Sequence, residues 1–157
     1  MPASTALERH VKCPDPAATS ALGRALAGAA EPGDLVCLWG DLGAGKTHLA
    51  KAFGVALGVN GTITSPSFIL MAEYEGRLPL FHIDLYRLAD ATDVLAGGLV
   101  DDRQSAGVTL VEWPDRMRDA LPQARLDVQI EGTGEEPRAV TVRAGDAGYR
   151  RYLDVLP

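Results

Sequence analysis

One eight-residue stretch constrains the fold of this chain more than any other feature. Residues 40–47 read Gly-Asp-Leu-Gly-Ala-Gly-Lys-Thr and match the phosphate-binding P-loop pattern G-x-x-x-x-G-K-[ST] at every position. In such a loop the glycines let backbone N–H groups curl around a phosphate. The lysine supplies a positive charge for the β- and γ-phosphates, and the threonine hydroxyl can bind Mg²⁺. The motif requires a strand before it and a helix after it, so it predicts both.

The residues on either side of this stretch have the required character. Residues 35–39 (Leu-Val-Cys-Leu-Trp) form an apolar run of strand length directly before it. Apolar residues then recur at helical spacing, at Leu49, Phe53, Ala56 and Leu57. We therefore predict a strand over residues 35–39, a helix over residues 46–57 and a nucleotide site on the loop between them. The first turn of that helix adds its partial positive charge to the site.

Length and composition indicate one soluble domain. The chain has 157 residues, 46% of them hydrophobic and 23% charged, which is ordinary for a globular protein with a full core. We predict a single P-loop ATPase domain over residues 1–157, with residues 1–14 as a loosely ordered lead and residues 122–157 as a terminal hairpin and tail. No apolar run reaches the length of a membrane span and no signal peptide is evident, so the expected location is the cytoplasm.

Charge and cysteine content argue against two classes of function. A net charge of −6 argues against a protein that binds nucleic acid by itself, because backbone binding needs a basic patch. It leaves open a partner that carries the nucleic acid. The two cysteines, Cys13 and Cys37, lack the spacing of a metal site, and we expect them to be small buried hydrophobic residues.

The remaining segments alternate between strand and helix signals. Asp15 and Pro16 are a typical N-cap and first helical residue, and Pro32-Gly33 ends that helix. Further strands are predicted over 68–75, 78–86, 108–111, 126–130 and 139–142, with short helices over 90–95 and 114–121. The first two and the last two of these strands form hairpins. We therefore predict an α/β fold of the P-loop NTPase type, a three-layer sandwich around a mixed central sheet.

Hydrolysis of a bound nucleotide also requires an acidic group near the metal, and two carboxylates follow apolar runs. Glu112 comes directly after a β-branched apolar run, the form of a Walker B element. A solvent-facing acid at a strand end is the alternative, and the P-loop favours the functional interpretation. Asp84 is ambiguous. Alternation places His82, Asp84 and Tyr86 on one strand face and Arg87 on the other, and this polar face is either functional or solvated.

Three further features near the motif have open interpretations. The hydroxyls of residues 64–67 (Thr-Ser-Pro-Ser) could reach a γ-phosphate or Mg²⁺ as a switch loop does, but composition alone favours a plain turn. Trp113 could cover the site, face a partner or pack in the ordinary way. His48 follows the P-loop threonine on the predicted helix, and we expect it to point away from phosphate.

Four segments in series resemble the bacterial TsaE (YjeE-type) family, the P-loop ATPase of tRNA threonylcarbamoyladenosine biosynthesis. They are residues 40–47, 64–68, 82–88 and 111–114, in the family's order and spacing. The resemblance implies ATP as the nucleotide, Mg²⁺ as the metal and slow hydrolysis. It also implies partnership with the TsaD and TsaB proteins, which install threonylcarbamoyl on adenosine 37 of tRNA. The chain would reach tRNA only through that complex.

The resemblance also implies a role for individual residues. The catalytic residues would be Asp84, Glu112 and Lys46, and the metal would be held by Thr47, Glu112 and Asp84. The nucleotide-binding stretch would be Gly40, Asp41, Leu42, Gly43, Ala44, Gly45, Lys46, Thr47 and His48. A switch-like loop would comprise Thr64, Ser65, Pro66, Ser67 and Phe68, and the partner or site cover would comprise Trp113, Tyr86 and Arg87. Ser67 and His48 depart from the family, which usually has threonine at the first position and often threonine or serine at the second.

Alternative functions remain open at this level. A small-molecule or nucleoside kinase has the same P-loop but usually an arginine-rich lid, for which residues 97–106 are short. A guanine-specific switch is disfavoured because no Asn-Lys pair occurs. A structural ATP-binding subunit is a third possibility. No arginine lies in or beside the P-loop in sequence, which favours an enzyme that is weak until a partner stimulates it. The adenine contacts are unassigned; the first helix and the residues before it are one candidate.

Overall fold

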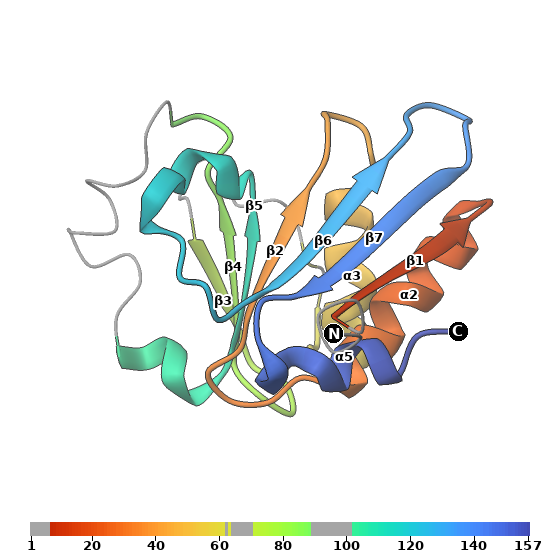
Figure 1. Ribbon diagram of the computed structural model, residues 1–157. Helices are drawn as coiled ribbons and strands as arrows, with labels where there is room; N and C mark the ends of the chain where they lie inside the picture. The colour runs from red at the N-terminus through yellow and green to blue at the C-terminus, as the bar shows by residue number, and fades with distance from the viewer. Residues whose placement is uncertain (1–6, 62, 64–70, 89–101) are drawn as a thin grey trace.

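Seven strands form one mixed sheet in the order β1-β7-β6-β2-β5-β4-β3 (Figure 1). The computed structural model describes residues 7–61, 63, 71–88 and 102–157, and the account that follows concerns these residues. The strands are β1 Glu8–Cys13, β2 Leu35–Trp39, β3 Met71–Tyr74, β4 Leu80–Asp84, β5 Val108–Glu112, β6 Leu126–Glu131 and β7 Arg138–Ala144.

Two long helices cover one face of the sheet, behind it in the view of Figure 1. The helices are α2 Pro16–Gly28, α3 Lys46–Ala56 and α5 Arg150–Asp154, with 3-10 helices η1 Asp102–Ala106, η2 Pro114–Ala120 and η3 Ala147–Tyr149. As predicted, Asp15 caps α2 by accepting a hydrogen bond from the Ala18 N–H at 2.9 Å. The helices α2 and α3 approach closely at Gly23, where an added Cβ would lie 2.8 Å from the Leu49 carbonyl oxygen.

The central four strands, β6-β2-β5-β4, are parallel, whereas β3, β7 and β1 pair antiparallel with their neighbours. The predicted mixed sheet and both predicted hairpins are therefore confirmed within the described residues. From β2 the chain passes to β4 and β5 on one side and then returns to β6 on the other. The carboxyl end of β2 is thus a topological switch point, where ligand crevices form in open α/β sheets.

Side-chain alternation along the strands divides the core into two layers. Val36 and Leu38 of β2 pack with α2, α3 and α5. Cys37, between them, packs on the opposite face with Val111 of β5 and Met117 of η2. The predicted α/β fold is confirmed, and in the described residues the layer on this second face is a 3-10 helix instead of an α-helix. No helix in these residues is long and apolar enough to span a membrane.

Residues 8–13 and 147–154 form regular structure that the sequence does not predict. Glu8–Cys13, predicted as part of a loose lead, forms β1 and pairs with β7 along its whole length. The free edge of β7 supplies backbone partners that local sequence cannot reveal. The predicted tail includes η3 and α5, and Tyr152 of α5 is fully buried. The predicted helix over 90–95, the first residues of the predicted strand over 68–75 and the switch-like loop over 64–68 lie outside the described residues.

Candidate nucleotide site

The P-loop follows β2 and leads directly into α3, as its sequence requires. Gly40, Gly43 and Gly45 have φ angles of 151°, 84° and 107°, a region that disfavours side chains. At Gly40 a Cβ would also lie 2.7 Å from the Ile130 carbonyl oxygen of β6. Gly45 is the N-cap of α3 and has no side chain to cap it, so the first N–H groups of the helix are available to an anion.

Lys46 is held against its own loop. Its Nζ donates to the carbonyl oxygens of Gly40 and Asp41, and it lies 4.2 Å from the centre of the Trp113 ring. The side chain is buried, and burial lowers the pKa of the Lys46 ammonium, while the nearby carboxylate of Glu112 acts in the opposite direction. A phosphate at this loop would supply the opposite charge that the buried ammonium favours.

Thr47 and Glu112 are the two side chains best placed to hold a metal ion together. The Thr47 hydroxyl donates to Glu112, with Oγ1 at 2.9 Å from Oε1 and 3.2 Å from Oε2. Adjacent ligands of an octahedral Mg²⁺ lie roughly 2.9 Å apart, because the Mg–O bonds are about 2.0–2.1 Å long. The described residues contain no group of three or more His, Cys, Asp or Glu side chains suited to a metal. The pair therefore fits Mg²⁺, which usually takes one or two protein ligands and completes its shell with phosphate and water.

Asp84 lies beside Glu112, opposite it in the β4–β5 register. It accepts a hydrogen bond from the Tyr86 N–H at 2.9 Å and lines a hollow of about 390 Å³, here called the P-loop hollow. This hollow is also lined by Lys46, Thr47, Glu112, Trp113 and Arg87. The prediction that Arg87 faces away from Asp84 is wrong. The strand ends at Asp84, so alternation does not extend to Arg87, and the following turn brings it to the same hollow.

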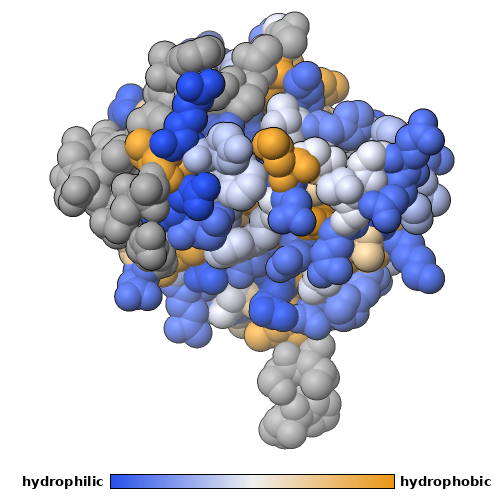
Figure 2. All heavy atoms as spheres, turned by 90° about the horizontal axis from the view of Figure 1, so that it is seen from above, coloured by the Kyte–Doolittle hydropathy of each residue, from blue (hydrophilic) through white to orange (hydrophobic). Residues whose placement is uncertain are grey.

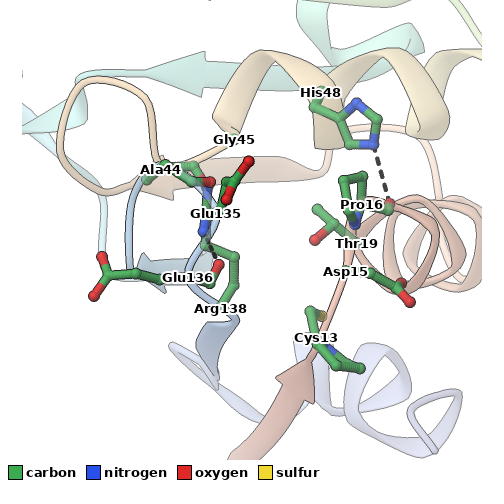
Figure 3. Close-up of a pocket in the computed structure, with 12 residues that line it drawn as sticks. Cys13, Asp15, Pro16, Thr19, Ala44, Gly45, His48, Glu135, Glu136 and Arg138 are labelled. Atoms are coloured by element: carbon green, nitrogen blue, oxygen red, sulfur yellow. Dashed lines mark hydrogen bonds between the residues drawn. The ribbon is translucent and has the colours of Figure 1, made fainter.

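A second hollow of about 440 Å³, here called the lateral hollow, lies beside the P-loop (Figure 3). It is bounded by the β1–α2 junction, the β6–β7 turn and the loop itself, with Cys13, Pro14, Asp15, Pro16, Thr19, Ala44, Gly45, His48, Gly134, Glu135, Glu136 and Arg138 in its lining. His48 points from α3 toward α2, where its Nε2 lies 3.1 Å from the Pro16 carbonyl oxygen and 2.8 Å from the Ser20 hydroxyl. His48 lines the P-loop hollow as well, so its direction relative to a bound phosphate stays a prediction.

Arg138, at the start of β7, binds the P-loop from the side through hydrogen bonds to its carbonyl oxygens. Its Nε donates to the Ala44 carbonyl oxygen at 2.8 Å, and its Nη2 donates to the Gly134 carbonyl oxygen at 3.0 Å. An arginine therefore lies beside the loop in space, although none does in sequence. Because carbonyl oxygens accept its donors, Arg138 supports the loop. The sequence carries no signal for it, since it follows no motif and lies 94 residues from Ala44.

Comparison with known proteins identifies the family. The model of the family described as "Threonylcarbamoyl adenosine biosynthesis protein TsaE" matches residues 13–140. The chain belongs to the TsaE family. The protein named "tRNA threonylcarbamoyladenosine biosynthesis protein TsaE" of Bacillus subtilis (strain 168) is 41% identical over 143 residues, which are 90% of this chain and 89% of that one. A protein of the same name from Streptomyces coelicolor is 40% identical over 128 residues, 77% of this chain and 86% of the relative.

A solved structure supports the same family. The chain described as "Crystal structure of Bacillus subtilus YdiB" superposes with a TM-score of 0.77 and 36% sequence identity. The match covers 94% of this chain and 92% of that one. The resemblance to the TsaE family seen in the sequence is therefore confirmed, together with the fold.

Three of the four TsaE motifs lie together around the P-loop hollow. They are the P-loop itself, the segment with Asp84 and Arg87, and the segment with Glu112 and Trp113. The fourth, Thr64 to Phe68, lies outside the described residues. Trp113 is half-buried with a φ of 61°, and its ring centre is 4.8 Å from that of Tyr86. The two rings form a rim on this hollow.

The surface at this end of the molecule is mostly hydrophilic, with separate small hydrophobic patches (Figure 2). Two exposed hydrophobic side chains border the P-loop hollow: Leu42 is 67% exposed and Tyr86 is 43% exposed.

His82 was not among the predicted site residues, and its strand face was left as either functional or solvated. It is fully buried, with Nε2 2.6 Å from Glu112 Oε2, so the solvated interpretation is wrong for His82.

Proposed function

We propose that this chain is a Mg²⁺-dependent ATPase required for N6-threonylcarbamoyladenosine formation in tRNA, acting on the TsaB–TsaD complex. The observation that carries the proposal is the Thr47–Glu112 pair beside Asp84 at the base of a P-loop, with 2.9 Å between Thr47 Oγ1 and Glu112 Oε1. Membership of the TsaE family, and the names of its relatives, support the pathway.

Different residues of the P-loop hollow have different roles in hydrolysis. The loop N–H groups and Lys46, released from the carbonyls of Gly40 and Asp41, bind the phosphates. Thr47 and Glu112 would hold Mg²⁺, which would supply positive charge to offset that of the phosphates. Asp84 shares the hollow with them, accepts one backbone hydrogen bond and orients the attacking water through its carboxylate.

The lateral hollow receives the adenosine part of ATP. It adjoins the P-loop at Ala44 and Gly45, and its volume of about 440 Å³ is within the range of small-molecule sites. The thiol of Cys13, the rings of Pro14 and Pro16 and the α2 residue Thr19 line it, a surface suited to a flat base. The sequence leaves the first helix and the residues before it as one candidate for the adenine contacts. The β6–β7 turn is now a second candidate, because it lines the same hollow.

A photoreactive adenine tests this assignment. We expect 8-azido-ATP to label residues 13–19 or 134–138, since these segments line the lateral hollow. Peptide mass spectrometry after irradiation locates the label, and excess ATP should abolish it. The Lys46→Ala variant should be labelled weakly, because it lacks the phosphate anchor. Label confined to Tyr86 or Trp113 would contradict this assignment.

Partner dependence is the second part of the proposal. The acidic net charge of −6 suits docking onto a complex that carries tRNA better than holding tRNA alone. Arg138, which lies beside the loop, is already bonded to carbonyl oxygens, so it does not supply the mobile cation that phosphoryl transfer commonly uses. Arg87 also lines the P-loop hollow, so the weak hydrolysis expected of the isolated chain rests on the family resemblance.

ATP hydrolysis by the purified chain, alone and with TsaB, TsaD and substrate tRNA, tests the function. We expect a low rate alone, a rate that rises with the concentration of the complex until it saturates, and no activity in the Lys46→Ala variant. Vigorous hydrolysis that is indifferent to the complex would contradict the partner assignment. Transfer of the γ-phosphate to a nucleoside would instead support a kinase.

A further inference from the structure

We infer that His82 is the positioning residue that holds the Glu112 carboxylate in its metal-binding orientation. The inference rests on the proposed function, because it concerns the residue that would hold Mg²⁺. His82 lies on β4, next to β5, and its Nε2 is 2.6 Å from Glu112 Oε2. The other carboxylate oxygen, Oε1, faces the Thr47 hydroxyl at 2.9 Å. Oε2 also lies 3.2 Å from Thr47 Oγ1, so its shorter contact is with His82 and the shorter contact of Oε1 is with Thr47.

The direction of the hydrogen bond follows from the chemistry of the two groups. An ionised carboxylate only accepts, so the contact requires a proton on His82 Nε2. With Oε2 bound to the ring, the carboxylate cannot rotate without losing this bond, and Oε1 stays directed at Thr47. Groups that orient metal ligands in this way commonly change metal affinity or activity by 10–100-fold when they are removed.

Burial indicates that the ring is not present for stability alone. His82 has no exposed surface, and its Nδ1 has no hydrogen-bond partner among the described residues. A buried polar atom without a partner destabilises a fold, and an apolar side chain of similar volume would not. The neighbouring buried positions Leu80 and Leu110 hold such apolar side chains. The polar ring is therefore explained by its contact with Glu112.

Two substitutions separate this role from packing. His82→Leu keeps an apolar volume and removes the donor. His82→Gln places an amide nitrogen near the position of Nε2 and can donate to Glu112. Binding of a fluorescent ADP analogue, titrated with Mg²⁺ and repeated in EDTA, measures metal dependence without relying on activity. For His82→Leu we expect the half-saturating Mg²⁺ concentration to rise about tenfold or more, with affinity in EDTA changed less than about twofold.

The glutamine variant is the test of rescue. We expect His82→Gln to lie within about threefold of the unmodified chain in Mg²⁺ dependence, because the donor to the carboxylate is retained. In the metal-free protein, ring ¹⁵N NMR should show His82 with the proton on Nε2 and a bare Nδ1, and both substitutions should remove this signal. His82→Leu removes an unpartnered buried nitrogen but also leaves Glu112 Oε2 without its donor, so the melting temperatures of both variants are measured as the control for folding.

Each outcome distinguishes the inference from the proposed function. If the unmodified chain binds nucleotide without any dependence on Mg²⁺, the metal assignment itself fails. If it depends on Mg²⁺ and His82→Leu matches it, only the role of His82 fails. Equal impairment of the leucine and glutamine variants would mean that the ring acts by shape and would overturn the inference. If His82→Leu does not fold, His82→Asn takes its place in the comparison with His82→Gln. The amide of this asparagine reaches only the position of Nδ1, so it cannot donate to Glu112.

Discussion

Replacing Glu112 by glutamine is expected to lower ATP hydrolysis about 100-fold or more while leaving metal-free nucleotide binding nearly unchanged. The substitution preserves the shape of the side chain but removes the charge that Mg²⁺ needs from its protein ligand. Loss of metal-assisted charge stabilisation of about 3 kcal/mol corresponds to roughly a hundredfold in rate. The phosphate contacts of Lys46 and the loop N–H groups do not involve Glu112, so binding in EDTA should persist.

The measurement is a single-turnover assay with the protein in excess over ATP, since hydrolysis by the isolated chain is expected to be slow. Glu131→Gln is the matched control. Glu131 also ends a parallel strand of the same sheet, β6, but it is exposed. It represents the solvent-facing acid that was the alternative interpretation of Glu112. Glu112 is buried, which already excludes the solvent-facing interpretation, and equal rates for the two variants would show that it has no role in hydrolysis.

Replacing Asp34 by alanine is expected to destabilise the fold by about 3–5 kcal/mol. Asp34 precedes β2, and its Oδ2 accepts hydrogen bonds from the Glu31 N–H at 2.9 Å, from the Arg151 guanidinium and from the Tyr152 hydroxyl. The carboxylate is buried, and Tyr152 is completely buried. Removing the acceptor leaves the buried Tyr152 hydroxyl without its partner and breaks one ion pair of Arg151, which keeps its pair with Glu31 at 3.1 Å.

Thermal and urea unfolding measure this effect. For a chain of this length, 3–5 kcal/mol corresponds to a fall in melting temperature of roughly 6–20 °C. Asp115→Ala is the control, because its ion pair with Arg116 spans 3.5 Å between side chains that are 45% and 30% exposed, and such pairs contribute at most about 1 kcal/mol. If the two variants have the same melting temperature, the bonds from Asp34 to Arg151 and Tyr152 do not hold α5 to the sheet.

The bonds from Asp34 to Arg151 and Tyr152, here called the Asp34 cluster, explain why the structure has a helix where the sequence predicts a tail. From the sequence, residues 147–154 have too few turns to form a helix by themselves, and a tail was the reasonable prediction. In the folded protein, Arg151 also donates to the Ala29 carbonyl oxygen at the end of α2, and Tyr149 accepts from the Leu35 N–H at 2.9 Å. These bonds join residues more than 100 positions apart, and they supply the stability that the short helix lacks.

The sequence by itself determined the P-loop, the strand before it, the helix after it and the position of two acids after apolar strand runs. The reason is that backbone preference, alternation and helical spacing are properties of neighbouring residues. Leu35–Trp39 is observed as predicted, and Val108–Glu112 extends the predicted strand to include the acid itself. Family resemblance then added roles to Asp84 and Glu112, and the sheet places these two side by side.

Only the tertiary structure decided which distant residues complete the site. Arg138 reaches the P-loop from the far hairpin, residues 13–19 and 134–138 meet to form the lateral hollow, and His82 lies against Glu112 because β4 and β5 are neighbours. Arg87 turns into the hollow because its strand ends at Asp84. None of these contacts has a local signal. Each depends on the order of strands in the sheet, which follows from how all of the apolar faces are buried together.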